Sequence, residues 1–64
     1  MPDEPTGEVY FEFRPIGNTV KVTAIDAATG VEVSVVAPAS AAQADLQRLA
    51  LQKLRTRLRS ASKP

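Results

Sequence analysis

Acid–base chemistry in this chain would have to come from carboxylates, because its 64 residues include no histidine and no cysteine. Nucleophilic catalysis of the Ser-His or Cys-His kind therefore cannot be assembled, and the usual zinc and haem ligand sets are absent. The acids that fall in patterned sequence are Glu8, Glu12, Asp26, Glu32 and Asp45. Glu8 and Glu12 share a face of one predicted strand, but Glu12 has a cationic partner predicted opposite it. We expect no enzymatic activity, no metal, no cofactor and no small-molecule substrate.

The glycines and the basic side chains are the residues of this chain that could bind phosphate groups. Phosphate cradles need several glycines just before a helix, whereas the three glycines of this chain are isolated. Six of the eight bases lie after residue 47, and five of the seven acids lie before residue 27. This asymmetry is typical either of a solvated helix face, whose cations suit the helix dipole, or of a basic surface for an acidic partner. The candidate nucleic-acid contacts are Arg48, Lys53, Arg55 and Arg59.

The elements that would position these side chains begin with three strands. Runs of alternating apolar and polar residues predict strands over residues 8–14, 19–26 and 31–37. Pro15, Gly17 and Asn18 indicate a turn after the first run, and residues 26–30 indicate another after the second. The chain is thus expected to form two consecutive hairpins.

The register of these hairpins follows from placing the apolar residues on one face, because a slip of one residue swaps the two faces. A four-residue loop at 15–18 predicts Phe13 opposite Val20 and Glu12 opposite Lys21. A second four-residue loop, at 27–30, predicts Ala24 opposite Val33. The resulting apolar face consists of Val9, Phe11, Phe13, Val20, Val22, Ala24, Val33 and Val35.

A helix over residues 40–59 is predicted to cover this apolar face. Ser40 followed by Gln43 is a capping-box pattern, and the residues after it are mostly strong helix formers with no interior glycine or proline. Apolar residues recur every three or four positions, which is typical of a buried stripe. The stripe consists of Ala42, Leu46, Leu49, Ala50, Leu54 and Leu58, and Leu51 lies at its margin.

The expected fold class is α+β: a three-stranded antiparallel β-meander with one C-terminal helix packed on one face (β-β-β-α). We expect residues 1–7 to be a disordered arm, residues 8–59 to form a single domain and residues 60–64 to be a disordered tail. The acidic, proline-containing start is unlike a signal peptide, and no run approaches the roughly 18 to 20 apolar residues of a membrane span. Together with the lack of cysteine, these features predict a cytoplasmic protein with no membrane partner.

Several segments carry a family resemblance. They are Glu8-Val9-Tyr10-Phe11-Glu12-Phe13, Gly17-Asn18, Val20-Lys21-Val22, Ala24-Ile25-Asp26-Ala27-Ala28-Thr29-Gly30 and the pattern Leu-x-x-x-Ala-Leu-x-Lys-Leu at 46–54. Through them the chain resembles a family of short alphaproteobacterial proteins that contain a domain of unknown function. The resemblance implies one bacterial domain and brings no activity.

A second resemblance is confined to topology. The order strand, turn, strand, proline and helix after Val20 is similar to the second half of a double-stranded-RNA-binding domain. That family carries a basic cluster in the first turn of its helix, whereas residues 40–45 of this chain include no cation. Its first helix also has no counterpart here. Both RNA-facing features of that family are therefore missing.

The function predicted from these patterns is a non-catalytic protein-interaction module. The third predicted strand, at 31–37, is apolar, carries one charge and is expected at a sheet edge, where an unprotected strand tends to pair with another chain. A homodimer and a monomer with a short edge remain equal alternatives, and the partner is either a second copy or another protein. The candidate partner surface is Val31, Val33, Val35 and Leu51. The alternative function is weak RNA binding through the basic side of the helix.

Overall fold

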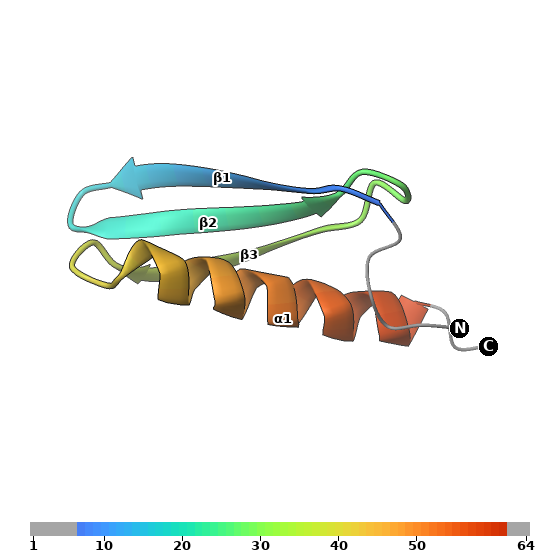
Figure 1. The fold of residues 1–64 in the computed structure, drawn as a ribbon. Helices are drawn as coiled ribbons and strands as arrows, with labels where there is room; N and C mark the ends of the chain where they lie inside the picture. The colour runs from blue at the N-terminus through green and yellow to red at the C-terminus, as the bar shows by residue number, and fades with distance from the viewer. Residues whose placement is uncertain (1–6, 62–64) are drawn as a thin grey trace.

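The chain forms a three-stranded sheet followed by one helix, in a computed structural model that describes residues 7–61 (Figure 1). The strands are β1 (Val9–Ile16), β2 (Thr19–Asp26) and β3 (Glu32–Pro38), and the helix is α1 (Gln43–Ala61). The sheet is antiparallel with the order β1-β2-β3, so β1 and β3 are its edges. The expected α+β class and β-β-β-α order are confirmed.

The first hairpin differs from the expected register by two residues. Phe13 lies opposite Val22 rather than Val20, and Glu12 lies opposite Thr23 rather than Lys21. The physical reason is a tighter turn: Gly17 adopts a φ of +60° and begins a two-residue loop, so β1 continues through Pro15 and ends at Ile16. A shift of two residues preserves the faces, and the predicted apolar face therefore survives the correction.

The second hairpin has the predicted register, with Ala24 opposite Val33. Its turn is closed by backbone hydrogen bonds from Gly30 N to Asp26 O at 2.8 Å and from Asp26 N to Val31 O at 2.8 Å. Gly30 has a φ of +77°, a backbone conformation that glycine adopts without strain. The turn chemistry recognised in the sequence therefore holds in the structure.

The helix begins three residues later than the capping-box pattern indicates. The first helical hydrogen bonds run from Asp45 N and Leu46 N to the carbonyl of Ala42, each at 3.1 Å, so Ser40 lies before the helix and does not cap it. The chain instead makes a turn in which Ala41 N donates to Pro38 O at 3.0 Å. Because this turn precedes the helix, α1 begins at Gln43; it ends at Ala61, beyond the predicted end at residue 59.

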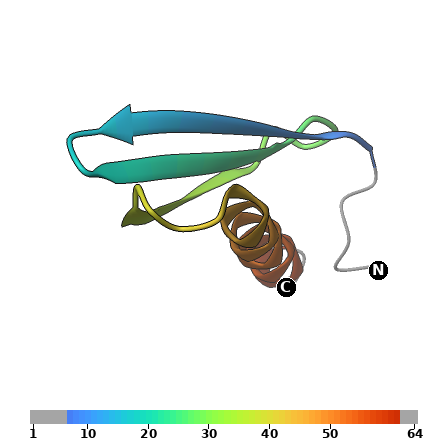
Figure 2. The same cartoon turned by 60° about the vertical axis from the view of Figure 1, so that its left-hand side comes forward.

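The core lies between α1 and the two strands beneath it, β2 and β3 (Figure 2). Its buried members are Val22, Ala24, Val33, Leu46, Ala50 and Leu54. Leu49, which the sequence pattern assigns to the buried stripe, is 53% exposed, and Ala42 is also exposed. The buried side chains of α1 are spaced by four residues, so its contact stripe is narrower than the predicted one.

The termini bear on two further expectations. The predicted arm at 1–7 lies outside the described residues except for Gly7, and residues 62–64 of the predicted tail lie outside them too. Ser60 belongs to α1 and is helical rather than part of a tail. Within residues 7–61, the helix is not apolar and long enough to span a membrane.

Candidate interaction surface

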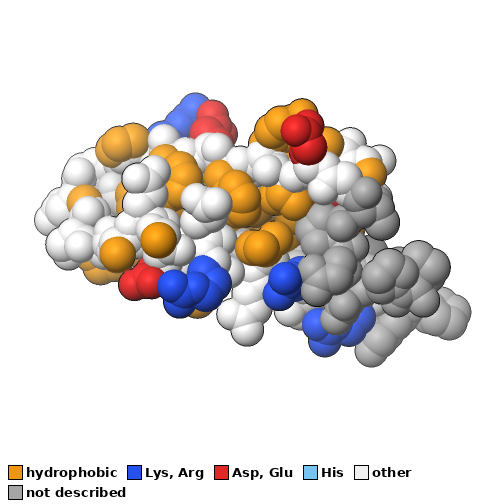
Figure 3. All heavy atoms as spheres, in the orientation of Figure 1, with side chains coloured by type: hydrophobic (Ala, Val, Ile, Leu, Met, Phe, Trp, Pro, Cys, Tyr) orange, Lys and Arg blue, Asp and Glu red, His pale blue; other side chains and the backbone are white. Residues whose placement is uncertain are grey.

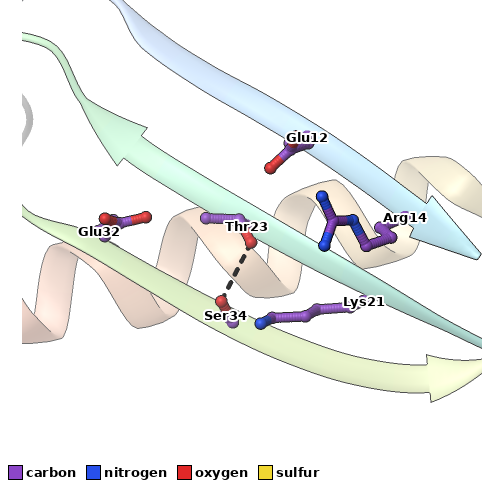
Figure 4. Close-up of a pocket in the computed structure, with 6 residues that line it drawn as sticks. All are labelled: Glu12, Arg14, Lys21, Thr23, Glu32 and Ser34. Atoms are coloured by element: carbon purple, nitrogen blue, oxygen red, sulfur yellow. Dashed lines mark hydrogen bonds between the residues drawn. The ribbon is translucent and has the colours of Figure 1, made fainter. Parts of the chain in front are cut away.

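The carboxylates of the described residues do not gather into a metal-binding group. Residues 7–61 contain no cluster of three or more His, Cys, Asp or Glu side chains that could hold a metal ion. Glu12 and Glu32 line a hollow on the polar face of the sheet together with Arg14, Lys21, Thr23 and Ser34 (Figure 4). The Thr23 and Ser34 hydroxyls are hydrogen-bonded across the strands at 3.1 Å. The hollow thus combines two acids, two bases and two mutually satisfied hydroxyls, a balanced polar surface without a nucleophile–base pair.

Asp26 is the one carboxylate that the fold buries among the described residues, with 1% of its surface exposed. Its Oδ2 accepts a hydrogen bond from Thr29 Oγ1 at 2.7 Å, and Thr29 Oγ1 in turn accepts from Val31 N at 3.2 Å. Oδ1 has no hydrogen-bond partner within residues 7–61. The buried Asp26 carboxylate therefore stabilises the second turn through its hydrogen bond with Thr29. Sequence reasoning placed Asp26 at this turn, but only the fold makes it buried.

The apolar face of the sheet is covered unequally. The β2 side chains Val22 and Ala24 are fully buried beneath α1, whereas Val9, Phe11 and Phe13 of β1 are only partly buried. All three contact the margin of the core, yet α1 packs mainly on β2 and β3. In Figure 2 the helix lies below the sheet, and β1 is the strand farthest from it. The predicted helix lid is therefore incomplete over β1, where a strip of apolar side chains stays partly exposed.

One flank of α1 borders this open strip. Lys53 lies on the other flank, because its Nζ donates a 2.7 Å hydrogen bond to the carbonyl of Ser34 on β3. Residues two positions apart on a helix point about 200° apart, so Leu51 lies on the flank nearer to β1. Leu51 is partly buried and lines a shallow, mostly apolar hollow with Ala44, Gln47 and Arg48. Leu58 lies on the same flank of α1 as Leu51 and packs at the edge of the core.

We call Val9, Phe11, Phe13, Leu51 and Leu58 the β1–α1 surface. Figure 3 shows apolar side chains gathered in a band between the sheet and α1, with basic side chains along the helix below it (Figure 3). A contiguous apolar strip with a polar border is typical of a protein contact site. Sequence reasoning missed this surface because it assumed that the helix covers all three strands.

The two sheet edges also differ in their backbone groups. Glu8 accepts a hydrogen bond from Ala27 N at 3.0 Å, so the even-numbered residues of β1 direct their backbone groups toward β2. The N–H and C=O groups of Val9, Phe11 and Phe13 consequently point outward. On β3 the outward carbonyl of Ser34 is occupied by Lys53. A lysine over an edge strand is a common protection against pairing, so β1 is the more accessible edge.

The structure does not bring the predicted partner residues together. The side chain of Val33 is in the core with 6% of its surface exposed, and Val31 and Val35 pack against that core. Leu51 is on the helix flank away from β3. These three valines therefore stabilise the fold through their side chains, and the exposed valine of β3 is Val36, on the opposite face of the sheet.

The predicted nucleic-acid contacts also separate. Arg48, Arg55 and Arg59 are spaced by seven and four residues and share one helix flank, while Lys53 lies toward β3. Arg48 forms an exposed ion pair with Asp45 at 2.9 Å. The basic side of the helix is therefore a row of three arginines rather than a four-residue cluster, and the first arginine of that row is paired to an acid.

Comparison with known proteins gives a family and no named relative. No curated protein and no solved structure matches the chain significantly. A family model for a domain of unknown function, DUF6898, matches residues 6–61, which include all three strands and the helix. Because the match spans well over half of the sequence, the chain belongs to the DUF6898 family.

Proposed function

We propose that this domain is a non-catalytic protein-interaction module that binds its partner through the β1–α1 surface. The observation that carries the proposal is the incomplete cover of the sheet. Phe11 and Phe13 lie on the same face as the fully buried Val22 and Ala24, but α1 packs mainly on β2 and β3, and both phenylalanines stay partly exposed at the margin of the core.

The partly exposed side chains of the β1–α1 surface include two large aromatic rings. Burying a large apolar side chain completely is worth about 1.5 to 3 kcal/mol, so two partly buried phenylalanines leave the smaller part of that free energy for a partner to supply. Aromatic residues also predominate in the centres of protein contacts. A partner that covers β1 would complete the apolar layer that α1 begins.

The chemistry of the remaining surface supports binding rather than catalysis. The polar hollow on the other face contains balanced charges and two hydroxyls that already bond each other. General base catalysis needs a base within hydrogen-bond reach of the group that it deprotonates, and the two hydroxyls of this hollow are paired to each other rather than to a carboxylate.

The test is site-specific photo-crosslinking in the native cell. A photoreactive phenylalanine analogue at position 11 keeps an aromatic ring where the chain has one, so the fold should tolerate it. The matched control places the same analogue at Val36, which is 67% exposed on the opposite face of the sheet. We expect specific products from position 11 and not from position 36. Their absence from position 11, or the same products from both positions, would contradict the proposal.

A further inference from the structure

We infer that the partner of the β1–α1 surface is a second copy of this chain, paired through β1 in an antiparallel register centred on Phe11. This inference rests on the proposed function and names its partner. A two-fold axis perpendicular to the sheet would join two three-stranded sheets edge to edge. Such an axis keeps the apolar faces of both sheets, and therefore both helices, on the same side.

The backbone of β1 suits this pairing. Its outward N–H and C=O groups belong to Val9, Phe11 and Phe13. In the register centred on Phe11, each Val9 pairs with Phe13 of the second copy, and the two Phe11 residues pair with each other. Every one of these outward groups then gains a hydrogen-bond partner. Pro15, which has no N–H, falls outside this ladder.

The side chains select this register by their charges. On the polar face, Glu8 of each chain would lie opposite Arg14 of the other, and Tyr10 would lie opposite Glu12. A shift of two residues in one direction would set the two Glu12 carboxylates opposite each other and bring Pro15 into the ladder. The opposite shift would set Glu8 against Glu12. Because opposed like charges destabilise strand pairs, the register centred on Phe11 is favoured over both neighbours.

The environment of Arg14 within one chain also favours a second copy. Arg14 lies directly opposite Lys21 on β2, which is an unfavourable cross-strand pair. Glu8 is six residues away along an extended strand, about 20 Å, and is hydrogen-bonded to Tyr10 OH at 2.8 Å. Glu8 of a second copy would approach Arg14 from the free side of β1. The pairing would therefore place an opposite charge beside Arg14 on the side away from Lys21.

The competing arrangement, in which β3 pairs with β3, is less favourable. Its central carbonyl, Ser34 O, already accepts a 2.7 Å hydrogen bond from Lys53 Nζ. On the helix-facing side of β3, Val33 is buried and Val35 packs against the core beneath α1, and neither is aromatic, so pairing there would bring no large apolar side chains together on that face. On β1, by contrast, the apolar layers of the two chains become continuous and the two Phe11 rings meet at the axis.

The experiment is a charge swap between Glu8 and Arg14, measured by sedimentation equilibrium. An interface one strand wide lies at the small end of specific contacts, so we use roughly 5 to 200 micromolar protein at low salt. E8R and R14E each replace two attractive pairs with two repulsive ones, and each should weaken the dimer by about 10- to 30-fold. An equimolar mixture of E8R and R14E should form a heterodimer, because all opposed charges are again complementary. The double variant should restore the homodimer for the same reason.

Rescue by mixing separates this pairing from a fold defect, because a destabilised chain gains nothing from a second destabilised chain. E32R, on the polar face of β3, is the matched control and should leave the dimer unchanged. Hydrogen exchange of the backbone amides locates the interface. The amides of Val9, Phe11 and Phe13 should become protected from exchange as the protein concentration rises, while those of Ser34 and Val36 should not. Protection of β3 alone, or E8R and R14E dimers as strong as the wild type, would overturn the inference.

A wild type that remains monomeric throughout this range would also overturn the inference. The photo-crosslinking result tests the proposed function independently of the self-pairing. If position 11 crosslinks a different protein while the chain sediments as a monomer, the self-pairing is wrong and the interaction module stands. If position 11 crosslinks nothing, both are wrong.

Discussion

Truncating Leu54 should destabilise this domain severely, whereas truncating Leu49 on the same helix should not. Leu54 is fully buried, with 0% of its surface exposed, and packs in the cluster formed with Val22, Ala24 and Ala50. Leu→Ala at such a site removes transfer free energy and leaves a cavity, so L54A should cost about 3 kcal/mol. Leu49 is 53% exposed and leaves no cavity, so L49A should stay within about 0.5 kcal/mol of the wild type.

The size of the chain makes this difference easy to measure. Stabilities of roughly 0.05 to 0.15 kcal/mol per residue place a 64-residue domain at about 3 to 10 kcal/mol, and small cores fall near the lower limit. A loss of about 3 kcal/mol lowers the ratio of folded to unfolded chains by about 100-fold or more. L54A should therefore be largely unfolded in mild denaturant.

Urea unfolding followed by far-ultraviolet circular dichroism is the suitable assay, because the chain has no tryptophan and its helix supplies a strong signal. With a denaturant slope near about 1 kcal/mol per molar, L54A should lower the midpoint by about 3 M and L49A by less than about 0.5 M. Both variants are compared at one protein concentration, since self-association would raise the apparent stability. Equal midpoint shifts would refute the placement of α1 on the sheet.

Two further predictions follow from the first turn and the helix flank. G17A should lower the free energy of unfolding by about 1 kcal/mol, because Gly17 has a φ of +60°. Nothing lies within 4 Å of an added Cβ, so this loss comes from backbone strain alone. The control is G7A, where no positive φ applies and the added Cβ would meet only Ala28 Cβ at 3.8 Å; equal melting temperatures for the two variants would contradict the turn assignment. If the arginine flank binds RNA, labelled duplexes titrated at about 50 mM salt should bind weakly with a steep salt dependence, and R48E should reduce that binding more than K53E. No binding near about 10⁻⁴ M protein would remove this alternative function.

The sequence was sufficient for the local parts of the fold. Alternation with a period of two defined three strands and their shared apolar face, since side-chain direction in a strand depends only on position along the chain. The second turn was predictable because Asp26 and Gly30 meet its backbone requirements directly. The absence of histidine and cysteine restricts the chemistry open to the chain, because composition alone removes the commonest bases, nucleophiles and metal ligands.

The register of the first hairpin could not be determined from the alternation of apolar and polar residues. Loops of two and four residues give the same faces, because they differ by two residues, and both bring apolar side chains opposite each other. The turn conformation of Gly17 decides between them, and it extends β1 through Pro15. Proline is acceptable there because its position faces the free edge rather than β2.

Only the tertiary structure decided which surface is left for a partner. The helix pattern indicates an apolar stripe but not where that stripe lies across the sheet, because the spacing of apolar residues along a helix does not specify which strands they contact. Packing α1 over β2 and β3 buried Leu54 and Val33, brought Lys53 to the β3 edge, and left Phe11 and Phe13 partly exposed on β1. Val33 of β3, which looks available in the sequence, became core, because burial depends on which strand the helix rests on.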